Sequence, residues 1–227
     1  MMFRLTNSPA TFQTMMNEIF VDLIVENKVC IYIDDILMYS GDLAEHCWIM
    51  DMVLWRLRKH KLYLKLDKCE FEQQCIEYLR LIISKGKIEI DPVKVAGVAE
   101  WPTPQSKKEV QQFVGFTNFY QWFIKDYHIA RPLFDLTGNI KFKWEEEQEQ
   151  AFRELRCQIT STPILAFPNE DKPFQVEADS LDFTTGAVLS QLSEEDGKWH
   201  PVAFYSKSLS AVEQNYDIYD KEMLAVI

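Results

Sequence analysis

The chain has 227 residues, of which 47% are hydrophobic and 26% are charged, and its formal net charge is −11 at pH 7. This composition predicts a folded protein of one or two domains and excludes a disordered chain. With no uncharged apolar run of about 18 residues and no secretory leader, we expect an intracellular protein of the cytoplasm or nucleus without a membrane partner. The acidic total argues against a simple polyanion-binding protein, because phosphate contacts require a local excess of lysine and arginine.

The five cysteines are odd in number and widely spaced, and none of them forms a Cys-x-x-Cys pair. Only four histidines accompany them as metal ligands. We therefore expect reduced thiols and no zinc site.

The first predicted element is a helix that begins near Ser8. Serine is a favoured N-cap residue, and Pro9 follows it at the first helical position. Apolar residues then recur at helical spacing, so the helix is predicted to continue to about Val25.

A β-hairpin with two acids at its turn is predicted next. Residues 29–33 are rich in β-branched side chains and residues 36–39 form a second apolar run, with Asp34 and Asp35 between them. Because side chains alternate along a strand, Tyr32 and Asp34 are expected to share one face, which favours Asp34 over Asp35 as a metal ligand. Two-metal phosphoryl transfer requires carboxylates projected from rigid backbone. The residues alone also fit a polar hairpin tip, where turn geometry favours aspartate.

An amphipathic helix is predicted from Asp42, and it leads into a basic segment. That segment carries one acid, Asp67, and six cations: Arg56, Arg58, Lys59, Lys61, Lys65 and Lys68. It fits either a solvated helix face or a surface that binds a polyanion.

The middle of the chain is predicted to contain short strands and a short helix. Strands over 69–75 and 77–84 precede a turn into a third strand over 88–90. Pro92 opens a helix, and the two prolines within 101–104 stop it because proline lacks an amide donor. This proline pair is the predicted internal boundary.

A helix predicted over 106–124 has an unusually aromatic face. The face is formed by Val110, Phe113, Val114, Phe116, Phe119, Tyr120 and Phe123. A core stripe explains such a face more often than a base-stacking surface does.

The last part of the chain is predicted to combine helices with strands. A helix over 145–160 carries acids in its first turn, where the helix dipole favours them. Strands over 174–179, 186–192 and 201–206 then precede a last helix near 211–227.

Short motifs follow one another in a fixed order along the chain. Residues 2–13 read M-F-R-L-T-N-S-P-A-T-F-Q, and residues 32–35 read Y-I-D-D. Further motifs lie at 62–71, 101–104, 113–120, 174–191, 201–206 and 219–226. Together they resemble the polymerase region of gypsy-type LTR retrotransposons, with its M-P-F-G-L-x-N-A-P-A-T-F-Q block, Y-x-D-D motif, primer-grip approach, thumb signatures and RNase H opening.

The resemblance implies the identity of the catalytic metal ligands. It implies that Asp34 and Asp35 bind Mg²⁺, or Mn²⁺ in its place, at a polymerase site. It also implies that Asp179, on the first strand of an RNase H domain, and Glu222, on its first helix, bind metal at a nuclease site. Without the resemblance, a lone strand aspartate and a lone helix glutamate are interpreted as surface residues.

The resemblance also implies which residues meet the substrates. Phe3, Arg4 and Tyr32 are expected to lie at the nucleotide and template, and Leu79 and Arg80 in the primer-grip region. The implied partners are an RNA template, a DNA primer, an RNA–DNA hybrid and a deoxynucleoside triphosphate. The basic segment and the aromatic helix become candidates for gripping a duplex through its phosphates.

The chain departs from the family pattern at several positions. Arg4 and Arg80 replace glycines that allow close approach to the backbone. Gln121 and Trp122 stand where basic residues are usual. Each change is expected to remove function more readily than fold.

We therefore predict an α+β chain with a partial reverse-transcriptase palm over 1–90, a thumb and connection region over 91–165, and a truncated RNase H-like domain over 166–227. The predicted function is that of a fragment of an RNA-directed DNA polymerase with RNase H activity. Because the family draws further acids from segments before residue 1 and after residue 227, we expect the chain to be inactive alone. The alternative is a non-catalytic remnant that binds nucleic acid or protein. The residues do not define an oligomeric state.

Overall fold

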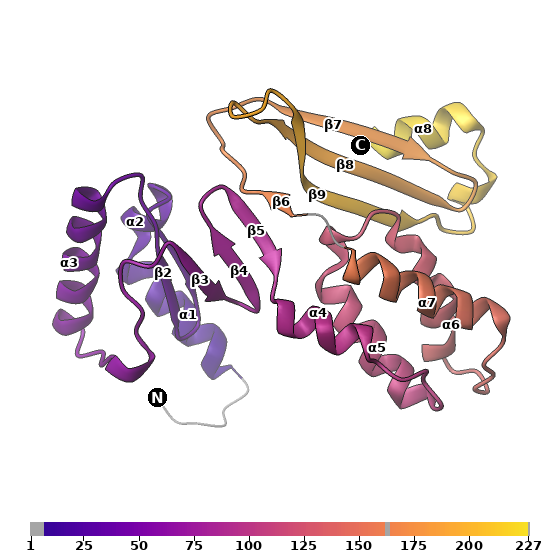
Figure 1. Ribbon diagram of the computed structural model, residues 1–227, viewed down its shortest axis with the longest axis horizontal. Coiled ribbons are helices and arrows are strands. Elements are labelled where there is room, and N and C mark those ends of the chain that lie inside the picture. Colours follow the sequence, from indigo (N-terminus) through magenta and orange to yellow (C-terminus); the bar gives the residue numbers. More distant parts are fainter. Residues whose placement is uncertain (1–6, 162–163, 227) are drawn as a thin grey trace. The chain divides into compact units, whose positions relative to one another are not determined.

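The computed structural model describes residues 7–161 and 164–226. The chain forms two compact units, residues 1–78 and 79–227, which Figure 1 shows with their elements labelled. Both units contain helices and strands, so the predicted α+β class is confirmed. The three domain ranges expected from the sequence stay predictions.

The first unit combines helices with a β-hairpin. Its elements in chain order are α1 (Ser8–Ile19), α2 (Val21–Val25), β1 (Val29–Tyr32), β2 (Asp35–Met38), α3 (Leu43–Lys59), the 3₁₀ helix η1 (Leu66–Lys68) and β3 (Cys75–Tyr78). Its core contains Met16, Phe20, Leu23, Val29, Ile49, Val53 and Leu57.

The helix predicted from Ser8 to Val25 is interrupted in the structure. Asn7, not Ser8, takes the N-cap position, so Ser8 is the first helical residue. The interruption falls at Phe20, which is fully buried and separates α1 from α2. Phe20 itself belongs to the core of this unit.

Two strand predictions in this region are wrong. Residues 69–74 form no strand, and only Cys75 of the predicted strand is extended in β3, because Glu72 has a φ of +53°, outside the range that a strand allows. The strand predicted over 77–84 is split between β3 and β4, since Leu79 and Arg80 also have positive φ values. Backbone conformation of single residues, which hydrophobic pattern does not report, decides both cases.

A single arginine ties α3 to the first two helices. The Arg56 guanidinium donates to the backbone oxygen of Ile19 at 2.9 Å and to both carboxylate oxygens of Asp22, with Nη2–Oδ2 at 2.5 Å. Its side chain is only 13% exposed. One member of the basic segment is therefore structural, and it is not available to a polyanion.

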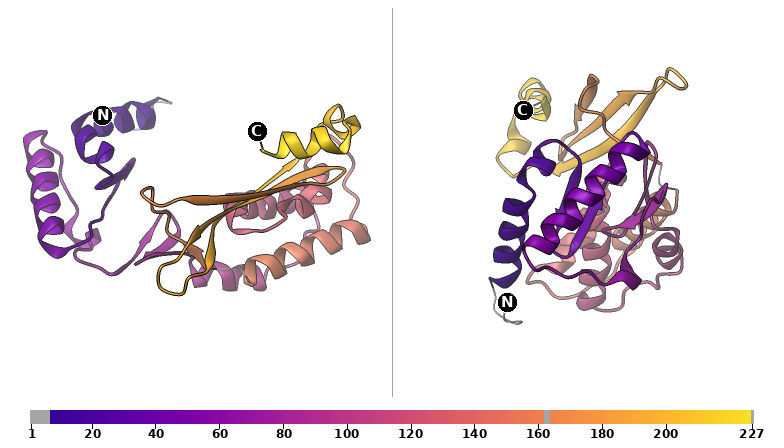
Figure 2. Two further views of the ribbon diagram at one scale, coloured as in Figure 1. Left: turned by 90° about the horizontal axis from the view of Figure 1, so that it is seen from above. Right: turned by 90° about the vertical axis from the view of Figure 1, so that its left-hand side faces the viewer.

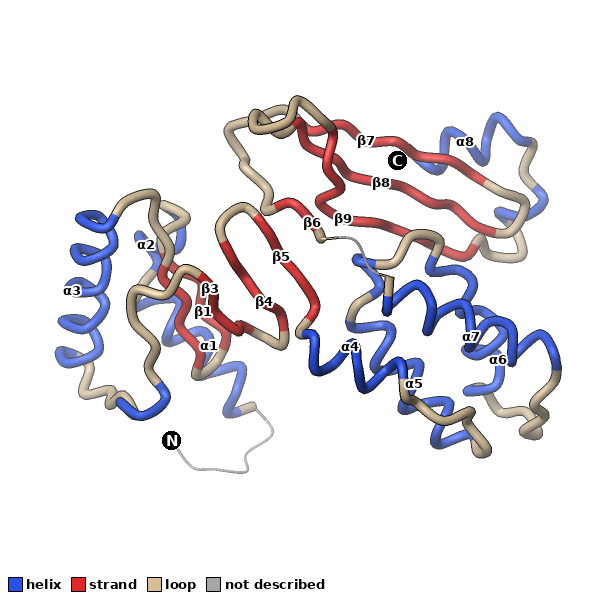
Figure 3. The backbone as a smooth tube through the Cα atoms, in the orientation of Figure 1, coloured by secondary structure: helices blue, strands red, loops and turns tan. Residues whose placement is uncertain are grey.

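The second unit contains helices and strands of two sheets, and Figure 3 distinguishes helices from strands by colour. Its helices are α4 (Pro92–Ala99), α5 (Lys107–Phe119), η2 (Gln121–Phe123), η3 (Tyr127–Ala130), α6 (Arg131–Thr137), α7 (Glu146–Thr160), η4 (Glu213–Asn215) and α8 (Ile218–Val226). Its strands are β4 (Leu81–Ser84), β5 (Lys87–Ile90), β6 (Leu165–Ala166), β7 (Phe174–Ser180), β8 (Thr184–Leu192) and β9 (Trp199–Ser208).

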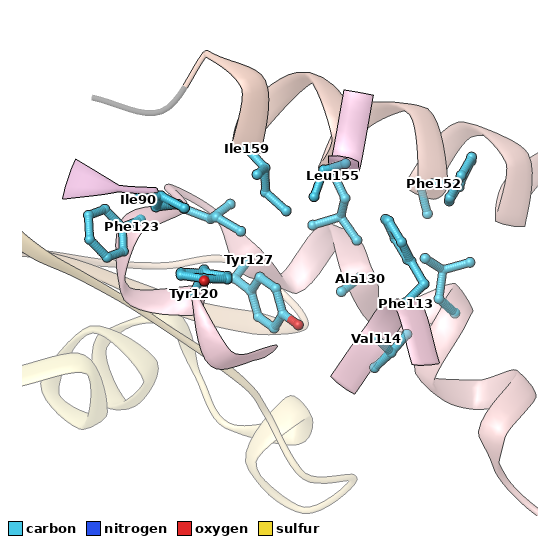
Figure 4. Packing of buried hydrophobic residues seen from close by; sticks show 14 of the residues in the cluster. Ile90, Phe113, Val114, Tyr120, Phe123, Tyr127, Ala130, Phe152, Leu155 and Ile159 are labelled. Atoms are coloured by element: carbon cyan, nitrogen blue, oxygen red, sulfur yellow. The ribbon is translucent and has the colours of Figure 1, made fainter. Parts of the chain in front are cut away.

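The aromatic face of α5 lies in the core of the second unit, as Figure 4 shows. The rings of Phe113 and Phe152 pack at an inclined angle with their centroids 4.7 Å apart, and Tyr120 and Phe123 are each 1% exposed. The prediction of a core stripe is confirmed for these rings, which cannot stack on bases while buried. Phe119 is the exception, at 43% exposed.

Two helices predicted from the sequence have different boundaries in the structure. The helix predicted over 106–124 ends at Phe119 and is followed by the separate turn η2. The last helix begins at Ile218 and not near residue 211, because Tyr216 is extended with a ψ of 150°. The 145–160 helix is confirmed as α7, with a capping box at Glu145.

In the second unit, β4, β5 and β6 pair antiparallel in that order, and β7, β8 and β9 form a separate antiparallel sheet in the order β7-β8-β9. Asp179 pairs with Gly186, which in turn pairs with Ser206. The helix α8 packs against β7 and β8, as Figure 2 shows in the view from above. Lys221 on α8 is 6% exposed, and its ammonium lies 3.7 Å from Asp182.

No helix within the described ranges is long and apolar enough to cross a bilayer.

Replacement of Asp22 by asparagine is expected to destabilise the folded chain at neutral pH but not in strong acid. The Arg56 guanidinium lowers the pKa of Asp22 from 3.8 to about 2. This carboxylate therefore stabilises the folded state above pH 3.8, and its contribution is lost as pH falls through about 2. The side chain is 51% exposed, so solvent screening limits the effect to about 1 kcal/mol.

Urea unfolding of wild type and Asp22→Asn at pH 7 and in acid measures this difference. Asp51→Asn is the matched control, since Asp51 is an exposed aspartate on α3 without an ion pair to any described residue. Equal destabilisation by both variants, or a difference that does not shrink in acid, contradicts the assignment.

Candidate functional site

The β1–β2 hairpin carries the two predicted polymerase acids. Val29 pairs with Met38 and Tyr32 with Asp35, which leaves only Ile33 and Asp34 in the turn. Ile33, the first turn residue, has a φ of +52°. The favoured two-residue hairpin turns have a positive φ at this position, which is usually occupied by glycine or asparagine. A β-branched residue in this region is strained by about 1–3 kcal/mol.

The side chain of Gln13 holds this turn from the neighbouring helix α1. The Ile33 amide donates to Gln13 Oε1 at 2.6 Å, and Gln13 Nε2 donates to the Ile31 carbonyl at 3.1 Å. Nε2 also donates to Asn17 Oδ1 at 2.8 Å within α1. One amide side chain therefore satisfies a donor and an acceptor of the hairpin backbone on both sides of Tyr32.

The structure confirms the tight hairpin tip and changes the interpretation of its two acids. Asp34 and Asp35 are both exposed. The alternation argument that favoured Asp34 is wrong, because β1 ends at Tyr32 and Asp34 lies in the turn. Asp35 begins β2 directly opposite Tyr32, so the ladder orients Asp35 more firmly than Asp34.

A tyrosine from β3 lies beside this hairpin. The Tyr78 hydroxyl donates to Cys30 Sγ on β1 at 3.6 Å. Burial raises the pKa of Tyr78 above its usual range, and the hydrogen bond to Cys30 and the nearby charge of Asp35 raise it further. A neutral phenol therefore contacts the hairpin beside the acids.

Most of the remaining basic segment is exposed on the first unit. Lys59 lies over the Trp55 ring at 5.1 Å, and Lys65 lies 3.6 Å from Asp67. Arg58, Lys61 and Lys68 form no ion pair with another described residue. These three cations are the part of the segment that is available to a polyanion.

The two primer-grip candidates form the turn that joins β3 to β4. Leu79 and Arg80 have φ values of +50° and +66°, a combination that favours glycine at the second position. The Arg80 guanidinium lies 5.8 Å from the centre of the Phe119 ring, and Tyr120 donates to the Arg80 carbonyl at 3.4 Å. Contacts with Phe119 and Tyr120 thus accompany an arginine at a position where the resemblance implies glycine.

The nucleotide and template candidates are only partly within the structure. Phe3 and Arg4 lie outside the described residues. Tyr32 is 53% exposed at the end of β1, so its ring is accessible beside the acids.

The nuclease candidates lie on elements that pack together. Asp179 on β7 and Glu222 on α8 are both exposed. The structure also brings Asp126 to this region, since its Oδ1 lies 3.8 Å from where a Cβ on Gly186 would be, and Gly186 is the partner of Asp179. Asp126 was not a candidate from the sequence, because it lies far from the RNase H-like motifs.

Both pairs of predicted acids offer the hard oxygen donors that divalent metal ions of the magnesium type prefer. Within the described ranges, no cluster of three or more histidine, cysteine, aspartate or glutamate side chains could hold a metal ion. Asp34 and Asp35 are therefore suited to bind a metal ion only together with further ligands that the described residues do not supply.

The sequence contains one signal for a role of Gln13, its place at the end of the first motif block. Gln13 is the last residue of the A-T-F-Q end of the first motif block, which resembles the family's A-P-A-T-F-Q sequence. Only the packing of α1 beside β1 shows that it holds the turn.

Two family profiles match the chain. The family described as reverse transcriptase (RNA-dependent DNA polymerase) matches residues 2–83, and the RNase H-like domain found in reverse transcriptase matches residues 144–227. The chain is 39% identical to the retrovirus-related Pol polyprotein from transposon opus of Drosophila melanogaster over 99% of its own length. It is 34% identical to the transposon Tf2-3 polyprotein of Schizosaccharomyces pombe over 100% of its length. It spans 23% and 17%, respectively, of these two relatives.

Solved structures show the same fold. The foamy viral protease-reverse transcriptase in complex with an RNA/DNA hybrid aligns with a TM-score of 0.83 at 20% identity, covering 100% of this chain and 30% of that chain. The form of that enzyme in complex with dsDNA aligns with a TM-score of 0.82. The fold is that of a reverse transcriptase. The chain belongs to the reverse transcriptase and RNase H-like region of gypsy-type LTR retrotransposon Pol polyproteins, as its motifs predicted.

Replacement of Gln13 by methionine is expected to loosen the turn that carries the acids. Methionine keeps the length of the side chain but removes both hydrogen bonds to the hairpin, which lowers the free energy of unfolding by about 2 kcal/mol. Amide hydrogen exchange at Ile33 is expected to accelerate, because its donor loses the Gln13 oxygen.

Asn17→Ala is the matched control for this variant. It removes the third hydrogen bond of Gln13 and leaves both bonds to the hairpin in place. If Ile33 exchanges at the same rate in wild type and Gln13→Met, the hydrogen bonds of Gln13 do not hold the turn.

Proposed function

We propose that this chain carries the polymerase carboxylates and part of the nuclease site of a Pol polyprotein. That protein would copy RNA into DNA and hydrolyse RNA within RNA–DNA hybrids. The observation that carries the proposal is the two-residue turn between β1 and β2, which exposes Asp34 and Asp35 while Gln13 fixes its backbone.

Reverse transcriptases and RNase H-like domains generally depend on divalent metal ions. We assign Mg²⁺, with Mn²⁺ as a substitute, to Asp34 and Asp35 at the polymerase site and to Asp179 and Glu222 at the nuclease site. Bound ions of this kind stabilise the charge on the attacking and leaving oxygens of a phosphoryl transfer. The role of the chain is to present the carboxylates from a backbone that does not reorganise.

The proposed partners are an RNA template, a DNA primer, an RNA–DNA hybrid and a deoxynucleoside triphosphate. Exposed cations on the first unit, including Arg58, Lys61 and Lys68, offer contacts to the phosphates of a duplex. The exposed Tyr32 ring beside the acids offers a surface for the nucleotide or template. An intracellular location is part of the same proposal.

The chain alone is expected to show neither primer extension nor hybrid cleavage, whereas a longer Pol segment that includes it is expected to show both. Two carboxylates at each site are fewer than a two-metal site requires. In the longer segment, Asp34→Asn or Asp35→Asn is expected to reduce primer extension by more than about a hundredfold, since each 1.4 kcal/mol of lost transition-state stabilisation is tenfold.

The control for primer extension is Asp51→Asn, which makes the same chemical change at an exposed site on α3. For the chain alone, the Asp34→Asn, Asp35→Asn, Asp179→Asn triple mutant reports contaminating activity in Mg²⁺ and Mn²⁺. Activity of the chain above that background shows that the other acids are dispensable. Full activity of Asp34→Asn and Asp35→Asn in the longer segment excludes the proposed polymerase site.

Asp179 and Glu222 are proposed to share one metal ion, because α8 packs against β7. Two carboxylates held close together repel each other unless a cation neutralises them. Calorimetry with Mg²⁺ or Mn²⁺ is expected to show weaker binding to Asp179→Asn than to wild type. Asp171→Asn, in the exposed segment before β7, is the matched control. Identical titration curves for wild type and Asp179→Asn would contradict the proposal that Asp179 binds this metal ion.

A further inference from the structure

A pocket of about 290 Å³ opens in the second unit between the short helices after α5 and the strand β9. Its polar lining is formed by Asn118, Gln121, His128, Arg131, Ser206 and Ser208. Each of these side chains can donate a hydrogen bond, and none of the described lining residues is a carboxylate. A donor-rich pocket of this kind is notable in a chain with 35 acidic and 24 basic residues.

The wall formed by η3 is fixed by buried contacts. Tyr127 is 6% exposed, and its hydroxyl lies 3.0 Å from the buried Thr117 hydroxyl. The His128 amide donates to Ser206 Oγ at 3.1 Å, which joins η3 to β9. Because the serine oxygen accepts that bond, its own hydroxyl hydrogen is free to point into the pocket. The lining is therefore preorganised before any ligand enters.

Most of the donors in this pocket have no partner within the part of the chain that the structure describes. The side-chain amides of Asn118 and Gln121 make no hydrogen bond to a described residue. Arg131 forms one described ion pair, from Nε to Asp135 Oδ1 at 3.4 Å. Both side chains of that pair are more than half exposed, so the pair is weak and leaves the terminal guanidinium nitrogens available.

We propose that this pocket binds a phosphate group. A guanidinium presents a planar fork that matches phosphate oxygens, and hydroxyl and amide donors can complete the coordination of the remaining oxygens. Arg131 supplies the positive charge, while Ser206 and Ser208 supply hydroxyls from the same face of β9.

The pocket lies on the same sheet as Asp179, the candidate nuclease acid. Ser206 pairs with Gly186, and Gly186 pairs with Asp179, so the three residues form one row across the sheet. Neighbouring strands lie about 4.8 Å apart, which places Ser206 about 10 Å from Asp179 on the same face. If the proposed function holds, a nucleic-acid phosphodiester in the pocket would fix a strand at a set distance from Asp179.

The pocket is tested by titrating the full chain with inorganic phosphate and following binding by NMR or calorimetry. Arg131→Gln is expected to weaken phosphate binding by about tenfold, because it removes the charged donor. Arg153→Gln is the matched control, since Arg153 is an exposed arginine in a comparable ion pair with Glu149 on α7 and does not line the pocket. Circular dichroism verifies that each variant is folded.

Two further variants make opposite changes at the same pocket. Asp135→Asn is expected to strengthen phosphate binding by removing the competing partner of Arg131. Ser208→Ala is expected to weaken it by removing one donor while leaving the charge unchanged. Equal phosphate affinity in wild type, Arg131→Gln and Ser208→Ala overturns the proposal, as does the absence of phosphate binding by wild type.

The source of the phosphate is distinguished by a second titration with a short RNA–DNA hybrid. Weaker hybrid binding by Arg131→Gln than by Arg153→Gln identifies a nucleic-acid backbone as the ligand. Loss of phosphate binding with unchanged hybrid binding identifies a small phosphate-bearing molecule. Either result is independent of polymerase and nuclease activity, so failure of the proposed function does not decide this test.

Discussion

The paired hydrogen bonds between Gln13 and the backbone of the β1–β2 hairpin are the constraint on which the candidate polymerase site depends. A two-residue turn with isoleucine at a positive φ is strained and would otherwise adopt other conformations. The Gln13 amide bonds to Ile31 and Ile33 on either side of Tyr32, so α1 and the hairpin form one rigid element. Two exposed acids can then stand at a fixed place without being buried.

The core of the second unit is built from packed aromatic and aliphatic side chains. Rings from α5 and α7 meet at the centre of its core, including Phe113 and Phe152. The short helices after α5 are held against this core, and they in turn contact β9 through His128 and Ser206. The polar pocket therefore forms where a rigid apolar core meets the edge of the sheet.

The arginine at position 80 illustrates how a substitution that departs from the family pattern can be accommodated. Its backbone adopts a conformation that glycine occupies without cost and that other residues occupy at about 1 kcal/mol. Its guanidinium lies over Phe119, and a cation–π contact of this kind contributes a stabilisation of similar size. The cation–π contact therefore offsets the cost of the backbone conformation, while the arginine side chain occupies space at a position where the resemblance implies glycine.

The sequence by itself determined the family, the α+β class, the apolar face of α5 and the presence of Asp34 and Asp35 at a hairpin tip. These features follow from local pattern and from motifs, both of which the order of residues contains. The tertiary structure alone decided that β1 ends at Tyr32, that residues 69–74 form no strand and that Arg56 is bound to Asp22. It also decided which distant residues meet, such as Gln13 with Ile33 and Asp126 with the Gly186 strand. Backbone conformation at single positions and contacts between remote segments depend on packing, which hydrophobic period and residue type do not specify.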